Sequence, residues 1–104
     1  MSSFKNVSIV KEANIYFNGN VTSRTIEFED GTIKSLGIML TGDYTFNTVD
    51  KEIMEIYSGA IEVKFAGTDT YKAMQGPCSF EVEANSSFDI KVTSVTDYCC
   101  SYLK

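Results

Sequence analysis

Hydrophobic and polar residues alternate at every second position along several stretches of the chain. The clearest runs cover residues 60–65, 88–93 and 98–103, with Ile61, Val63, Phe65, Phe88, Ile90, Val92, Tyr98, Cys100 and Tyr102 as their alternate members. A period of two places successive side chains on opposite faces of a β-strand, so each run predicts a strand with one buried face. No long segment has helical period, and only Asp50 to Met54 hints at a helical turn.

Glycine and polar turn residues interrupt these runs at short intervals. The breaks fall at residues 18–20, 29–31, 41–43, 58–59, 66–68 and 76–77. Short strands separated by frequent turns are typical of β-sandwiches and barrels. The chain has 104 residues and shows no internal boundary, repeat or low-complexity tract. We therefore expect one all-β domain spanning residues 1–104.

The balance of charges narrows the range of partners. The formal net charge is -5, and an acidic surface repels phosphate backbones, which disfavours nucleic acid as a partner. No apolar run is long enough to predict a membrane span, so we expect no membrane association. The first residues lack the apolar core of a signal peptide. These features predict a cytoplasmic protein.

The potential metal ligands and nucleophiles are few. The chain has no histidine and three cysteines, Cys78, Cys99 and Cys100. An odd number that includes an adjacent pair makes a poor disulfide framework, so we expect reduced thiols. Cys100 is a poor candidate nucleophile because no histidine is available to activate it. Transition-metal sites favour imidazole ligands, which this chain lacks, and we expect no metal.

Five ordered blocks cover nearly the whole chain. They are Asn14-x-Tyr16-Phe17-x-Gly19-x-Val21, Gly42-Asp43-Tyr44-Thr45-Phe46-x-Thr48, Glu52-x-Met54 with Ser58-Gly59, Phe80-x-Val82-x-Ala84-Asn85-Ser86-x-Phe88, and Tyr98-x-Cys100-x-Tyr102. Together they resemble the pyrimidine/purine nucleoside phosphorylase family of small single-domain cupins, over about residues 14–103. One departure is Glu83, where family members tend to carry proline.

The resemblance implies a fold and an activity. The fold would be a single cupin-type double-stranded β-helix, also called a jelly-roll barrel, assembled as a homodimer. The activity would be phosphorolysis of purine and pyrimidine nucleosides to free base and ribose 1-phosphate. Inorganic phosphate would be the co-substrate, and no cofactor would be needed.

The resemblance also suggests site residues. Glu52 lies where the first cupin motif places its glutamate, and Phe88 falls where the second motif has a ligand histidine. We expect Glu52 to be catalytic, although a solvent-facing acid at a strand end is its simpler interpretation. Candidate substrate-binding residues are Tyr44, Phe46, Thr48, Met54, Asn85, Ser86, Phe88, Tyr98 and Tyr102. For any single one of these, ordinary core packing is the simpler interpretation.

Two questions stay open at the level of sequence. Lys34 and Arg24 are candidate phosphate contacts, but backbone amides and Ser or Thr hydroxyls are equally suitable. The protein could instead be a non-catalytic cupin that binds a small ligand, because fold does not fix function. A metal-dependent cupin with an unusual ligand set is a further alternative.

Overall fold

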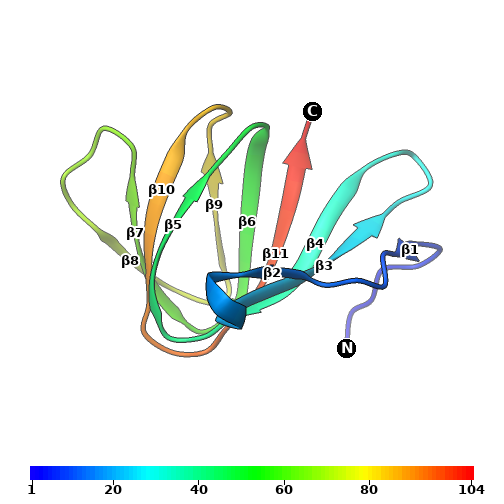
Figure 1. Ribbon diagram of the computed structural model, residues 1–104, viewed down its shortest axis with the longest axis horizontal. Coiled ribbons are helices and arrows are strands. Elements are labelled where there is room, and N and C mark those ends of the chain that lie inside the picture. Colours follow the sequence, from blue (N-terminus) through cyan, green and yellow to red (C-terminus); the bar gives the residue numbers. More distant parts are fainter.

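The computed structural model describes residues 1–104 and is built almost entirely from β-strands, with no α-helix (Figure 1). The strands are β1 (Ser8–Ile9), β2 (Asn14–Tyr16), β3 (Val21–Glu27), β4 (Ile33–Met39), β5 (Gly42–Asn47), β6 (Lys51–Ser58), β7 (Ala60–Phe65), β8 (Lys72–Gln75), β9 (Cys78–Val82), β10 (Ser87–Val92) and β11 (Thr96–Leu103). A short 3-10 turn, η1 (Phe17–Gly19), joins β2 to β3. The all-β expectation is confirmed.

The strands form two antiparallel sheets that face each other (Figure 1). The larger sheet has the order β1-β3-β4-β11-β6-β9, with β2 paired to β3, and the smaller has the order β5-β10-β7-β8. The C-terminal strand β11 lies in the middle of the larger sheet, between β4 and β6. Strands distant in sequence are therefore neighbours in space, as the jelly-roll prediction requires.

The core lies between the two sheets. From the smaller sheet it takes the alternate apolar side chains of β7 and β10, including Ile61, Val63 and Ile90, each at most 1% exposed. From the larger sheet, Met54 and Ile56 of β6 pack against them. Period two thus identified the buried face of these strands, because alternate side chains point to one side of a pleated sheet.

Two local expectations were wrong. The segment from Asp50 to Met54 does not form a helical turn, because β6 begins at Lys51 and runs through it as a strand. In addition, β11 is buried on both faces over most of its length, with Cys99 0% exposed on the face opposite Cys100. Cys99 is small and lies in register between Leu36 of β4 and Glu55 of β6, whose longer side chains share its face and cover it. Alternation within β11 alone does not show this.

Gly37 allows one close approach that shapes the interior. A Cβ at this position would lie 2.1 Å from the Thr22 carbonyl oxygen and 2.9 Å from Cε1 of Tyr98. The missing side chain therefore lets strands β3 and β4 pair closely beneath the Tyr98 ring.

No helix of the structure is long and apolar enough to span a membrane.

Candidate functional site

A cavity of about 290 Å³ opens between the two sheets. Its lining residues come from β2, β3, β4, β5, β6, β10, β11 and the β5–β6 loop: Tyr16, Ser23, Ser35, Met39, Phe46, Asn47, Val49, Asp50, Glu52, Met54, Phe88, Tyr98, Cys100 and Tyr102. The register of the larger sheet explains one wall, because Tyr102 of β11 pairs with Glu52 of β6. Cys100, two residues earlier, pairs with Ser35 of β4.

Glu52 is one of two acidic residues on the wall of this cavity, the other being Asp50. Alternation along β6 turns Glu52 and Met54 to the cavity, whereas Lys51 forms an ion pair with Glu81 at 3.4 Å. The Cys100 thiol donates a hydrogen bond to Oε1 of Glu52, with Sγ and Oε1 3.4 Å apart. Burial raises the pKa of the Glu52 carboxyl above its usual range, the thiol hydrogen bond opposes that rise, and the charge of Asp50 adds to it.

The cavity contains hydroxyl groups that stay protonated at neutral pH. Burial raises the pKa of Tyr98 to about 12 and raises the pKa of Tyr102 well above its usual range. The Tyr102 hydroxyl and Ser35 Oγ are 3.1 Å apart and share a hydrogen bond. Both phenols are therefore available as neutral hydrogen-bond partners for a ligand.

Cys100 is unsuited to nucleophilic attack. Burial is the main cause of the large rise in the pKa of its thiol, and the nearby charge of Glu52 adds to it. The thiolate, not the thiol, is the reactive form of cysteine. Cys100 therefore acts in this site as a hydrogen-bond donor to Glu52.

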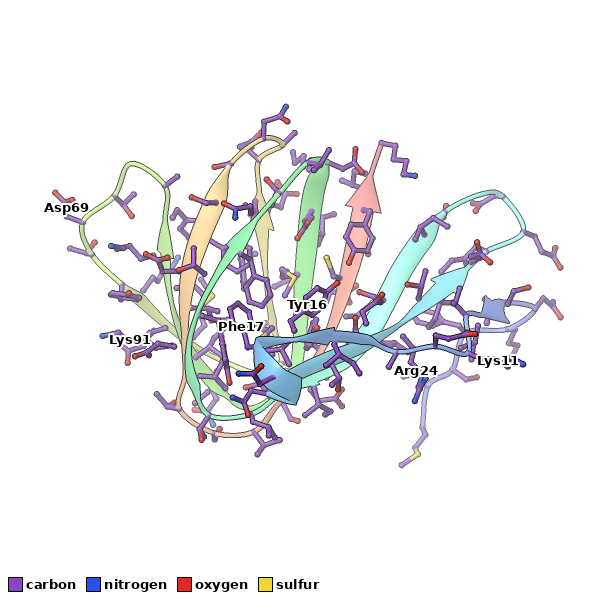
Figure 2. The ribbon with its side chains drawn as sticks, viewed as in Figure 1. Lys11, Tyr16, Phe17, Arg24, Asp69 and Lys91 are labelled. Atoms are coloured by element: carbon purple, nitrogen blue, oxygen red, sulfur yellow. The ribbon has the colours of Figure 1, made fainter.

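Aromatic rings form the opposite wall. Phe46 of β5 stacks on Phe88 of β10, with ring centroids 5.5 Å apart and an interplanar angle of 25°. Tyr16 meets the Phe46 ring edge-on at 6.4 Å. Figure 2 shows Tyr16 and Phe17 over the middle of the sandwich, where β2 and η1 cross it. Flat hydrophobic faces of this kind suit an aromatic ligand.

The structure brings six of the predicted residues to the cavity: Phe46, Glu52, Met54, Phe88, Tyr98 and Tyr102. Tyr44 is not among them. Its hydroxyl donates to the backbone oxygens of Leu40 at 2.7 Å and Thr41 at 3.3 Å, and its ring packs on Phe17. Tyr44 thereby anchors the turn between β4 and β5.

Thr48, Asn85 and Ser86 support the rim of the cavity instead of lining it. The Thr48 hydroxyl donates to the Glu83 carbonyl oxygen at 2.6 Å and accepts from the Ser86 amide at 2.9 Å. Asn85, in a left-handed turn conformation, donates its amide to the Val49 carbonyl oxygen. These bonds tie the β9–β10 turn to the β5–β6 loop, which carries two lining residues.

The candidate phosphate contacts, Lys34 and Arg24, do not line the cavity. The Lys34 ammonium lies 5.5 Å from the ring centroid of Phe4. Arg24 donates to the carbonyl oxygen of Lys11 and lies with it beside the N-terminal strands (Figure 2). Neither side chain contributes positive charge to the lining of the cavity.

Sequence reasoning missed several lining residues. Tyr16 belongs to the first of the five sequence blocks, which could have marked it as a site residue. Asp50 lies two residues before Glu52, so the alternation of a strand would place both side chains on the same face. Ser23 and Ser35 could not have been identified in this way, because a serine within a strand is typical of a solvent-facing position. Both are instead at most 4% exposed.

The site does not fit a cupin metal. No group of three or more His, Cys, Asp or Glu side chains is arranged to hold an ion. Phe88, at the position of a ligand histidine in the cupin motif, stacks on Phe46 and offers no donor atom. The expectation of a metal-free protein stays a prediction.

Comparison with known proteins gives consistent results. A family model described as pyrimidine/purine nucleoside phosphorylase matches residues 11–102. A Sulfurimonas denitrificans protein named pyrimidine/purine nucleoside phosphorylase is 58% identical over 104 residues, covering 100% of both chains. A solved structure of a protein of unknown function from Acinetobacter sp. ADP1 has a TM-score of 0.93 at 40% identity, covering 97% of this chain and 98% of that one.

More distant similarity concerns the fold alone. An RmlC-like cupin from Shewanella frigidimarina superposes with a TM-score of 0.69 at 13% identity, covering 96% of this chain and 86% of that one. The cupin fold expected from the sequence blocks is therefore confirmed.

Proposed function

The chain belongs to the pyrimidine/purine nucleoside phosphorylase family, and on that premise we propose that it cleaves purine and pyrimidine nucleosides with inorganic phosphate. The products are the free base and ribose 1-phosphate, so the protein acts as a pentosyltransferase. The observation that carries the proposal is a cavity lined both by a half-buried carboxylate, Glu52, and by stacked aromatic rings.

The aromatic wall accounts for the base. Phe46 lines the cavity with the buried ring of Phe88 stacked on it, and every nucleobase has a flat π-face that an aromatic wall can contact. Few directional groups surround these two rings, so purines and pyrimidines are accepted with modest discrimination. Met54, an adaptable side chain, lines the same cavity from β6.

Glu52 accounts for the sugar. Cleavage of a glycosidic bond develops positive charge on the ribose ring, by analogy with glycoside hydrolysis. An ionised carboxylate held in a partly desolvated cavity stabilises that charge more strongly than it would in water. The Cys100 thiol engages Oε1 and so limits the orientations open to the carboxylate. Glu52 also suits hydrogen bonding to the ribose hydroxyls.

Phosphate, as co-substrate, is held by neutral donors in this proposal. The hydroxyls of Ser35 and Tyr102 and the side-chain amide of Asn47 are among the neutral donors in the lining. Lys34 and Arg24 lie away from the cavity, and their predicted contact with phosphate stays a prediction. Phosphate attacks the anomeric carbon on the face opposite the departing base.

The direct experiment is incubation of the purified protein with a mixture of nucleosides, with and without phosphate. We expect free bases and ribose 1-phosphate only when phosphate is present. Binding of nucleosides without any base release would favour the non-catalytic ligand-binding cupin.

Assembly and location extend the proposal. Ile9, Ile15 and Ile38 are 58%, 66% and 39% exposed along an apolar groove on the outer face of the larger sheet, which supports a homodimer formed there. Sedimentation of the protein and of Ile15→Glu tests this, with a monomeric variant expected.

Three free cysteines support a reducing, cytoplasmic compartment, which cell fractionation tests.

A further inference from the structure

The cavity carries negative charge and no positive charge. Asp50 and Glu52 are its only charged lining residues, and neither lysine nor arginine reaches it. The intervening Lys51 is turned away and paired with Glu81 at 3.4 Å. Both carboxylates line the same cavity, and the charge of Asp50 adds to the rise in the pKa of Glu52.

Aromatic rings line the same cavity as these carboxylates. Phe46 and Phe88 stack within the lining, and Tyr16 stands edge-on to Phe46. Aromatic faces attract cations through their quadrupole, and they do so more strongly where water is excluded. Carboxylates and ring faces in one cavity therefore match a ligand that is both flat and positively charged.

We propose that the cavity accepts cationic nucleosides, in which a pyridinium ring is attached to ribose through its nitrogen, and selects them over uncharged analogues. This proposal rests on the phosphorolysis described above and specifies the substrate class of the same site. The positive ring would lie against Phe46, because Phe88 is only 2% exposed, within the field of Asp50 and Glu52. Its charge would also offset the repulsion between the carboxylates and incoming phosphate.

The chemistry is balanced without an added proton. A phosphate oxygen forms a bond to the anomeric carbon as the bond from that carbon to the pyridinium nitrogen breaks. The electron pair of the broken bond passes to the ring nitrogen, which becomes neutral. One negative charge of phosphate is lost in the new carbon–oxygen bond, so charge is conserved. No general acid is required, which suits a cavity whose thiol and phenols have raised pKa values.

Calorimetric binding tests the selectivity directly. The probes are nicotinamide riboside, a cationic N-ribosylpyridinium, and its 1,4-dihydro form, which has nearly the same shape and no charge. We expect the cationic form to bind roughly tenfold more tightly, because an attraction of that size is ordinary for a charge pair near a protein surface. In Asp50→Asn the ratio should fall by at least half.

Asp69→Asn is the matched control. It removes the same charge from an exposed loop between β7 and β8, at the far end of the molecule from the N-terminal strands (Figure 2). The binding ratio should be unchanged in this variant. An equal fall in both variants would show that net charge alone attracts the ligand, and the proposal would be overturned.

Activity separates this inference from the proposed function. Release of nicotinamide and of uracil, from the cationic riboside and from uridine, is followed with phosphate and against a protein-free control. Cleavage of uridine with no binding preference for the cationic riboside would overturn the inference and leave the phosphorylase intact. A clear preference in binding without cleavage of either nucleoside would support the selectivity and refute the phosphorolysis.

Discussion

Replacement of Gly37 by alanine tests how closely the fold and the cavity are coupled. The new Cβ would lie 2.1 Å from the Thr22 carbonyl oxygen, which belongs to the backbone of the neighbouring strand. That is roughly 1 Å closer than a packed interior tolerates, so β3 and β4 must separate. The φ angle of Gly37 is not positive, and the cost therefore comes from contact alone.

The magnitude follows from that contact. Overpacking costs about 1–3 kcal/mol, and a clash with backbone places Gly37→Ala near the upper end. At about 4–8 °C per kcal/mol for a domain of this size, about 3 kcal/mol lowers Tm by about 12–24 °C. Nucleoside affinity should also fall, because the same Cβ would lie 2.9 Å from the ring of Tyr98.

Thermal unfolding followed by circular dichroism measures this prediction. Gly67→Ala is the control, because a Cβ there meets nothing within 4 Å and its cost arises from a φ of +81°. That cost is about 1–2 kcal/mol. A Gly37→Ala protein that loses no more stability than Gly67→Ala would refute the argument that strand contact at Gly37 shapes the cavity.

Three further predictions concern the rim, the carboxylate and the metal. Thr48→Val removes the hydroxyl that bonds Glu83 and Ser86 and should cost about 1–3 kcal/mol in denaturant unfolding, whereas Thr48→Ser should retain most of the stability. Activity that needs ionised Glu52 is lost as pH falls through the raised pKa of that carboxyl. In the pH profile of kcat/KM, the acid limb should move to lower pH in Asp50→Asn, which removes a charge that raises this pKa, and to higher pH in Cys100→Ala, which removes a hydrogen bond that lowers it. Acid limbs at the same pH in both variants would contradict the assignment of this limb to Glu52. Treatment with a chelator should leave phosphorolysis unchanged, and activity lost together with one metal ion per chain would refute the metal-free site.

Much of the fold was predictable because period-two alternation is a local property of the sequence. The runs around Ile61, Ile90 and Tyr98 all became strands whose predicted faces are buried. Alternation within each strand could not show that β11 lies between β4 and β6, since that order depends on contacts between distant segments. Only the resemblance to small cupins implied such an order. The burial of Cys99 on the outer face of β11 follows from the same order.

The site was only partly predictable for a related reason. A residue type shows which chemistry is possible, but not which partner satisfies it. Tyr44 and Thr48 have suitable hydroxyls, yet both donate them to backbone oxygens. Nothing in the sequence around Ser35 indicates a site residue. Ser35 lines the cavity because β4 pairs with β11, which brings its hydroxyl to that of Tyr102.

The central claim is that Glu52 in the cavity drives phosphorolysis, and steady-state kinetics of Glu52→Gln test it most directly. The substitution keeps the size of the side chain and removes its charge. With uridine and phosphate as substrates, we predict that kcat falls by a factor on the order of 100, as for loss of one preorganised electrostatic contact, while Tm changes little. An unchanged kcat in a folded Glu52→Gln protein would contradict the mechanism.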